Sequence, residues 1–168
     1  KELLKKLSQK KGCYVPSLYT ITKGENGKIT DIASDTGAPV PVQKNNILNL
    51  NDAVYPKKYL VPNMGIVHDR VTLEIMRGCT RGCRFCQAGY IYRPLRERDV
   101  DKLENMAKNL IDDTGYNEVS LCSLSSSDYS HIQQLMDGLT EDLSKRCVSV
   151  ALPSLRLDNF SRDLIRQI

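Results

Sequence analysis

The chain has 168 residues, 40% of them hydrophobic and 26% charged, which is typical of a globular domain with a packed core and excludes a wholly disordered chain. Its formal net charge of +4 is too small to identify a partner by itself. The apolar stretches are no longer than strands and no signal-peptide pattern is present, so we expect a cytoplasmic protein without a membrane partner. Its six cysteines should then be thiols or metal ligands.

Residues 1–70 are predicted to form an irregular lead-in arm. Leucines at helical spacing indicate a short helix over residues 1–11, and the Asn26-Gly27 pair within residues 18–32 predicts a β-hairpin. Four prolines between residues 34 and 65 favour an extended segment without its own core. The chain starts without methionine and ends inside an amphipathic pattern, so we expect a fragment of a longer protein.

Residues 71–168 alternate between strand and helix patterns, which predicts an α/β fold with a parallel sheet. The expected strands are residues 71–76, 118–124 and 148–152, and the expected helices are residues 100–114, 130–144 and one that begins at residue 160 and runs to 168. Functional loops leave the carboxyl ends of the strands in such sheets, so the loops after these three strands are the candidate site.

Three cysteines follow the first predicted strand in a C-x3-C-x2-C pattern, at Cys79, Cys83 and Cys86. Three thiolates can bind three irons of a [4Fe–4S] cluster, and the remaining iron then stays open to a small molecule, as in catalytic metal sites. A structural zinc site, or a structural cluster closed by Cys122, is an alternative. The potential fourth zinc ligands are Cys122, Cys147, His68 and His131.

The cysteine motif resembles the signature of the radical S-adenosylmethionine superfamily, including the aromatic Phe85 just before the last cysteine. The wider pattern, from His68 through residues 123–129 to residues 152–156, resembles an uncharacterised branch. Proteins of this branch often have a cobalamin-binding-like domain upstream and are related to methylthiotransferases. The resemblance implies a partial barrel of six strand–helix units, of which residues 71–168 would supply the first three.

The same resemblance implies an iron–sulfur oxidoreductase whose cluster is bound by Cys79, Cys83 and Cys86. The cluster would reductively cleave S-adenosylmethionine to a 5′-deoxyadenosyl radical, which takes hydrogen from an unknown substrate. An electron donor of flavodoxin or ferredoxin type would be a partner. Cobalamin could be used only through a domain outside this chain. We assign no catalytic side chain, and the alternative function is a non-catalytic zinc or iron–sulfur module.

The other two loops supply the remaining candidate cofactor-binding residues, together with Phe85. The resemblance places the amino group of S-adenosylmethionine near the loop after the second strand, at Ser125, Ser126, Ser127 and Asp128. A helix cap formed by Ser127 or Asp128 is the competing interpretation. Strand alternation extends the third strand's face to Ser154 and Arg156. Arg156 would then bind a carboxylate or simply pair with Asp158.

An arginine-rich stretch raises nucleic acid as a further partner. Only Glu97 opposes six arginines, at Arg77, Arg81, Arg84, Arg93, Arg96 and Arg98. We therefore keep an RNA-binding or RNA-modifying protein of methylthiotransferase type as an alternative, beside a solvated basic loop. The unpaired edge of the third strand is also expected to favour self-association.

Overall fold

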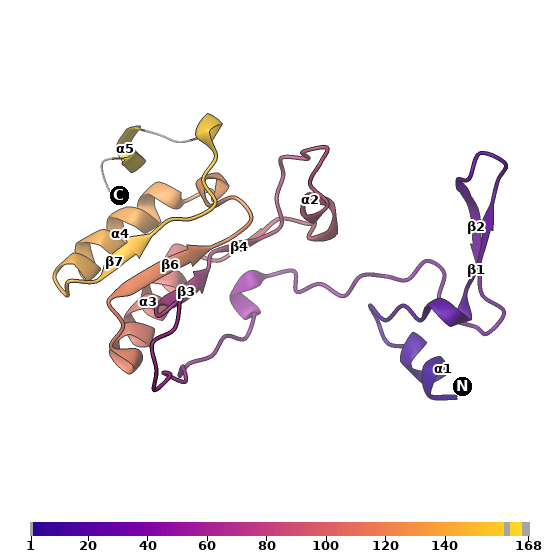
Figure 1. The fold of residues 1–168 in the computed structure, drawn as a ribbon, viewed down its shortest axis with the longest axis horizontal. Coiled ribbons are helices and arrows are strands. Elements are labelled where there is room, and N and C mark those ends of the chain that lie inside the picture. Colours follow the sequence, from indigo (N-terminus) through magenta and orange to yellow (C-terminus); the bar gives the residue numbers. More distant parts are fainter. Residues whose placement is uncertain (1, 160–161, 166–168) are drawn as a thin grey trace. The chain divides into compact units, whose positions relative to one another are not determined.

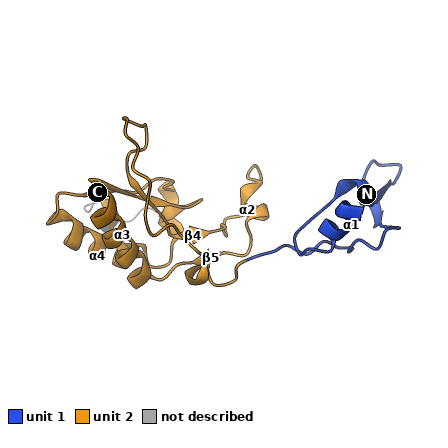
Figure 2. Ribbon diagram, turned by 90° about the horizontal axis from the view of Figure 1, so that it is seen from below, with its two compact units in different colours: residues 1–46 blue, residues 47–168 orange. Residues whose placement is uncertain are grey.

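The computed structural model describes residues 2–159 and 162–165, and its contacts divide the chain into residues 1–46 and residues 47–168 (Figure 2). The arm proposed from the sequence ended at residue 70. In the structure, Leu50 and Ala53 are buried, and Tyr55 and Tyr59 pack against the core of the larger unit. The proline-containing residues from 47 onward therefore belong to that unit.

The first unit combines one short helix with one two-stranded sheet. Helix α1 spans Glu2–Ser8, and strands β1 (Thr20–Lys23) and β2 (Ile29–Ala33) pair antiparallel (Figure 1). At the turn, Gly27 adopts a φ of 72°, and the Asn26 side chain accepts a 3.0 Å hydrogen bond from the backbone of Lys28. Every residue of both strands is exposed, so this sheet contributes no core.

A three-stranded parallel sheet forms the centre of the second unit and confirms the predicted α/β class. Strands β3 (Val71–Glu74), β6 (Glu118–Cys122) and β7 (Ser149–Ala151) lie in the order β3-β6-β7. Val71 pairs with Val119, which in turn pairs with Val150. The described residues contain three strand–helix units, and the six-unit barrel stays a prediction.

Two amphipathic helices cover the sheet (Figure 1). Helix α3 spans Val100–Thr114, the range that its periodicity predicts, and ends at Gly115, whose φ is 71° and whose amide donates to the Ile111 carbonyl at 2.9 Å. Helix α4 spans Ile132–Ser144 and packs beside α3. The third predicted helix appears as α5 (Arg162–Ile165), and residues 160–161 and 166–168 lie outside the described residues.

Between β3 and α3 the chain forms three short elements, and the predicted strand over residues 71–76 is divided between β3 and the first of them. Strands β4 (Met76–Arg77) and β5 (Arg96–Glu97) pair antiparallel, so the two ends of the segment between them lie side by side. Helix α2 (Ala88–Ile91) lies within that segment. Short 3₁₀ turns, η1 (Pro16–Leu18), η2 (Leu50–Asp52), η3 (Ser126–Asp128) and η4 (Leu157–Asn159), complete the fold. Among the residues described, none of the helices is long and apolar enough to cross a bilayer.

Candidate functional site

The cysteine loop, residues 78–87, leaves the sheet through a glycine that no other residue could replace without strain. Gly78 has a φ of 92°, and a Cβ there would lie 2.7 Å from the Tyr92 carbonyl oxygen and 2.9 Å from that of Pro94. Both contacts are backbone atoms and cannot turn away. Gly78 therefore lets the outgoing strand pass directly against the returning segment. Gly82, with a φ of 63°, makes a second left-handed turn inside the loop.

The three cysteines of this loop are free thiols and half-buried. The Cys86 amide donates to the Cys83 carbonyl at 3.0 Å, which fixes the turn between them. In the part of the chain that the structure describes, no group of three His, Cys, Asp or Glu side chains has gathered closely enough to hold a metal ion.

The chemistry of the donors fits a cluster bound by thiolates. Three sulfur ligands come from one loop, none is tied up in a disulfide, and arginine side chains lie close to them. Arg81 interacts electrostatically with Cys79, and Arg156 Nη1 lies 3.7 Å from Cys83 Sγ.

The serine-rich loop after β6 is buried and internally bonded. Ser125, Ser126 and Ser127 are 2%, 0% and 4% exposed. The Ser126 hydroxyl pairs with that of Ser123 at 2.9 Å, and the Ser126 amide donates to the Ser154 carbonyl at 3.1 Å. The loop is therefore joined to the segment that follows β7.

The helix-cap interpretation of this loop is wrong. Ser126–Asp128 form η3, and α4 begins only at Ile132, where the residue before it, His131, gives no side-chain cap. Tyr129 lies between η3 and α4, where its hydroxyl donates to the Arg98 carbonyl at 2.7 Å. This bond fixes the segment before α4 to the junction of β5 and α3.

The side chain of Asp128 is hydrogen-bonded to residues from all three loops. Its carboxylate accepts hydrogen bonds from Arg81 Nε at 2.8 Å, Ser125 Oγ at 2.8 Å and Asn159 Nδ2 at 2.7 Å. The bond from Arg81, with those from Ser125 and Asn159, holds the pKa of Asp128 far below its usual range, although burial acts in the opposite direction. The carboxylate thus connects the cysteine loop to the loops after β6 and β7.

The loop after β7 differs from its prediction. Strand β7 ends at Ala151 and Ser154 has a φ of 60°, so strand alternation does not continue to Ser154 and Arg156. Arg156 donates through Nε and Nη2 to Asp158, at 3.0 and 2.8 Å, which matches the pairing alternative. Its backbone amide also donates to Ser127 Oγ at 3.2 Å.

Phe85 lies apart from this polar network. Its side chain is 92% exposed, and nearby in sequence Tyr90 and Tyr92 are 57% and 51% exposed. The guanidinium carbon of Arg93 lies 5.4 Å from the centre of the Tyr90 ring. Residues 85–92 therefore expose three aromatic side chains to solvent.

Much of the arginine-rich stretch is structural. Arg77 pairs bidentately with Glu74, at 2.6 and 2.9 Å. Arg96 donates to the carbonyls of Pro94 and Tyr92, at 2.9 and 3.0 Å. Arg98 is only 2% exposed, and burial lowers its pKa. A run of arginines in a sequence does not distinguish such buried, carbonyl-binding side chains from solvated ones.

Several residues that build the site were not among the predicted ones. The sequence indicates Arg81 only as a positive charge between two cysteines, and its pair with Asp128 appears only in the structure. Asn159 carries no sequence signal, because its bonds to Asp128 and to the Ser127 carbonyl depend on the turn after β7.

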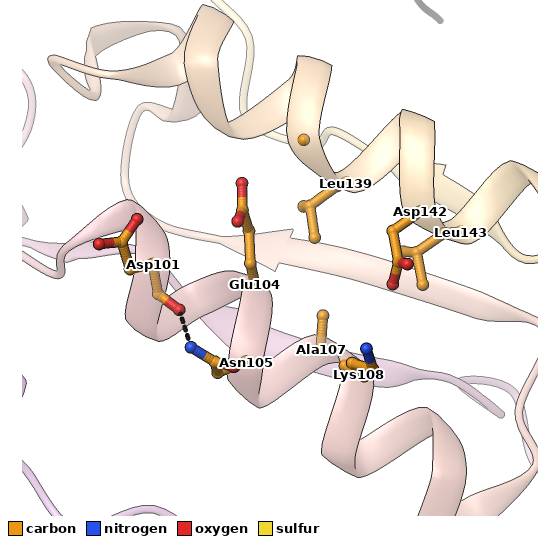
Figure 3. Close-up of a pocket in the computed structure, with 9 residues that line it drawn as sticks. Asp101, Glu104, Asn105, Ala107, Lys108, Leu139, Asp142 and Leu143 are labelled. Atoms are coloured by element: carbon orange, nitrogen blue, oxygen red, sulfur yellow. Dashed lines mark hydrogen bonds between the residues drawn. The ribbon is translucent and has the colours of Figure 1, made fainter.

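A separate polar hollow lies between α3 and α4, away from the cysteine loop. Figure 3 shows the Glu104 side chain pointing from α3 toward α4. A Cβ on Gly138 of α4 would lie 1.9 Å from Glu104 Oε1, so the glycine makes room for this carboxyl group. Burial, with the charges of Asp101 and Asp142, raises the pKa of Glu104.

Comparison with known proteins supports the resemblance seen in the cysteine motif. The model of the radical SAM superfamily matches residues 73–168, which include the end of β3, the strands β6 and β7 and all three loops. An uncharacterized protein of Methanocaldococcus jannaschii is 35% identical over 122 residues, covering 67% of this chain and 27% of that protein.

Other relatives carry a functional name. A tRNA-2-methylthio-N(6)-dimethylallyladenosine synthase of Phocaeicola vulgatus is 32% identical over 85 residues, covering 51% of this chain and 18% of the relative. The corresponding synthase of Bacteroides fragilis is 29% identical over the same length. The matched part of the chain thus spans about a quarter or less of the length of these relatives.

Proposed function

Because the chain belongs to the radical SAM superfamily, we propose that its cysteine loop binds a [4Fe–4S] cluster and S-adenosylmethionine in an enzyme that starts radical chemistry. Cys79, Cys83 and Cys86 would hold three irons as thiolates and leave one iron for S-adenosylmethionine. When bound, the cluster supplies one electron to the sulfonium, whose cleavage gives a 5′-deoxyadenosyl radical. The observation that carries the proposal is the set of three free, half-buried thiols in one loop at the edge of a parallel sheet.

The protein's own residues hold this loop in place. Arg81 of the cysteine loop donates a hydrogen bond to Asp128. Asp128 also accepts hydrogen bonds from Ser125 and Asn159. Because these partners already occupy the carboxylate, an ammonium group of S-adenosylmethionine would have to displace Arg81 or bind backbone carbonyls of the loop. We propose that the backbone carbonyls of residues 125–128 bind this ammonium group, since the bond between Arg81 and Asp128 then stays intact.

Phe85 is proposed to contact the cofactor through its ring. Phe85 directly precedes Cys86 in the sequence and is 92% exposed, so its ring is open to contact from a bound molecule. Covering this ring with an aromatic base would remove apolar surface from water. Exclusion of water around a reactive intermediate also prevents side reactions.

The test is anaerobic reconstitution of the full-length protein with iron and sulfide. After reduction with dithionite and addition of S-adenosylmethionine, 5′-deoxyadenosine should form. Changing Cys79, Cys83 and Cys86 to alanine should abolish the product. The matched control changes the other three cysteines, Cys13, Cys122 and Cys147, and should retain it. A single bound zinc, or product formation that survives the first triple change, would overturn the proposal.

RNA is a second candidate, as the substrate of this enzyme. Arg84 is exposed beside Phe85, and Tyr90 and Tyr92 expose half of their surface. Bases of single-stranded nucleic acids stack on such rings and gain from nearby cations. RNA binding should weaken with salt, survive Cys79→Ala and be reduced by the paired change of Tyr90 and Tyr92 to alanine. Binding unaffected by the tyrosine changes would contradict this candidate.

A further inference from the structure

The guanidinium of Arg156 is oriented by one acidic neighbour. Its Nε and Nη2 donate to the two carboxylate oxygens of Asp158, at 3.0 and 2.8 Å. A bidentate pair of this kind fixes the plane of the guanidinium. The third nitrogen, Nη1, then lies 3.7 Å from Cys83 Sγ, a distance compatible with an N–H donor to sulfur.

The backbone of Arg156 is fixed to buried groups as well. Its amide donates to Ser127 Oγ at 3.2 Å, and Ser127 is 4% exposed. The Asn159 side chain donates to the Ser127 carbonyl at 2.8 Å. Arg81 Nη1 lies 3.7 Å from Asp158 Oδ2 and supports the acidic partner. The residue that contacts Cys83 is therefore held at both its backbone and its side chain, by Ser127 of the loop after β6 and by Asp158 of the loop after β7.

A donor directed at a ligand sulfur favours the reduced form of an iron–sulfur cluster. Reduction adds one electron from an external donor, so the negative charge on the sulfur atoms rises while no bond forms or breaks. Hydrogen bonds to these sulfurs and nearby positive charge stabilise that added charge. Building on the proposed function, we infer that Arg156, oriented by Asp158, raises the reduction potential of the cluster through Cys83.

The experiment is a redox titration of the reconstituted full-length protein, followed by electron paramagnetic resonance. Arg156→Gln should lower the ratio of reduced to oxidised cluster about tenfold at a fixed solution potential, equivalent to ~59 mV for one electron. Arg156→Lys keeps the charge but loses the forked geometry, and should give a smaller shift. The matched control is Arg146→Gln, which removes the same charge from the turn before β7. There Arg146 forms an ion pair with Asp112 of α3.

A second variant guards against loss of the cluster in Arg156→Gln. Asp158→Glu keeps both charges but changes the geometry of the pair that orients the arginine, so its potential should move in the same direction by less. Wild-type potentials in both Arg156→Gln and Asp158→Glu, with normal cluster content, would overturn the inference and leave the proposed function intact. An equal shift in Arg146→Gln would also overturn it. Failure of the wild-type protein to bind a cluster would refute both.

Discussion

Removing one hydroxyl group, by Tyr129→Phe, should weaken the connection between the loop after β6 and the start of α3. Tyr129 is 2% exposed, and its hydroxyl donates to the Arg98 carbonyl at 2.7 Å. The substitution keeps the ring in the core but leaves a buried carbonyl without its donor. Near neutral pH we expect the free energy of unfolding to fall by about 1.5 kcal/mol, the usual cost of such a loss.

The pH dependence of this difference follows from the pKa of Tyr129. Burial, with the charges of Glu97 and Asp99, raises this pKa to about 12. In the unfolded chain it is about 10, so the folded state binds the phenol proton more tightly. The resulting stability is complete below about pH 10 and is lost as the pH rises toward 12. Near pH 11 the wild-type protein should have lost ~1.4 kcal/mol, whereas the phenylalanine variant has no such proton to lose.

The assay is urea unfolding followed by circular dichroism, under anaerobic reducing conditions, at several pH values between 7 and 11. Cysteines, lysines and the other tyrosines titrate in both proteins, so their effects cancel in the difference. The stability gap between wild type and Tyr129→Phe should nearly close at the upper end of this range. A gap that stays constant across the range would refute the burial of the hydroxyl against Arg98.

Two further predictions concern the backbone at Gly78 and the hollow between α3 and α4. Gly78→Ala should lower the free energy of unfolding more than Gly115→Ala does. Both substitutions place alanine in a left-handed backbone conformation, at a cost of about 1–2 kcal/mol. Only the Cβ added at residue 78 also clashes with backbone oxygens, so equal losses of stability in urea unfolding would contradict the close approach at Gly78. Glu104→Gln should stabilise the protein near neutral pH, because the raised pKa of Glu104 means that its charged form is disfavoured on folding. The gain should disappear below about pH 4, where glutamate is protonated in both states, and a loss of stability at neutral pH would contradict it.

The regular part of the fold could be predicted because its patterns are long. The apolar positions of α3 repeat over four turns and Gly115 ends the helix, so the predicted and observed ranges agree. Strands β4 and β5 contain two residues each, too few for any alternation to appear in the sequence. The helix α2 is one turn long and is stabilised by its surroundings rather than by its own residues.

The candidate site was predictable only in part, for a related reason. The spacing of Cys79, Cys83 and Cys86 is local in sequence and indicates its chemistry directly. The partners of Asp128 are not local, since Arg81 lies 47 residues away and Asn159 lies 31 residues away. Arg156 could be read as a carboxylate ligand or as a partner of Asp158, and only the turn after β7 shows that it also contacts Cys83.

Whether one iron of the cluster stays free of protein ligands is tested most directly by electron paramagnetic resonance of the reconstituted, dithionite-reduced protein. Adding S-adenosylmethionine should change the spectrum of the cluster, because the added molecule binds the iron that no side chain holds. A cluster spectrum that is identical with and without S-adenosylmethionine would mean that the centre is closed, and the proposed radical chemistry would then have no starting point.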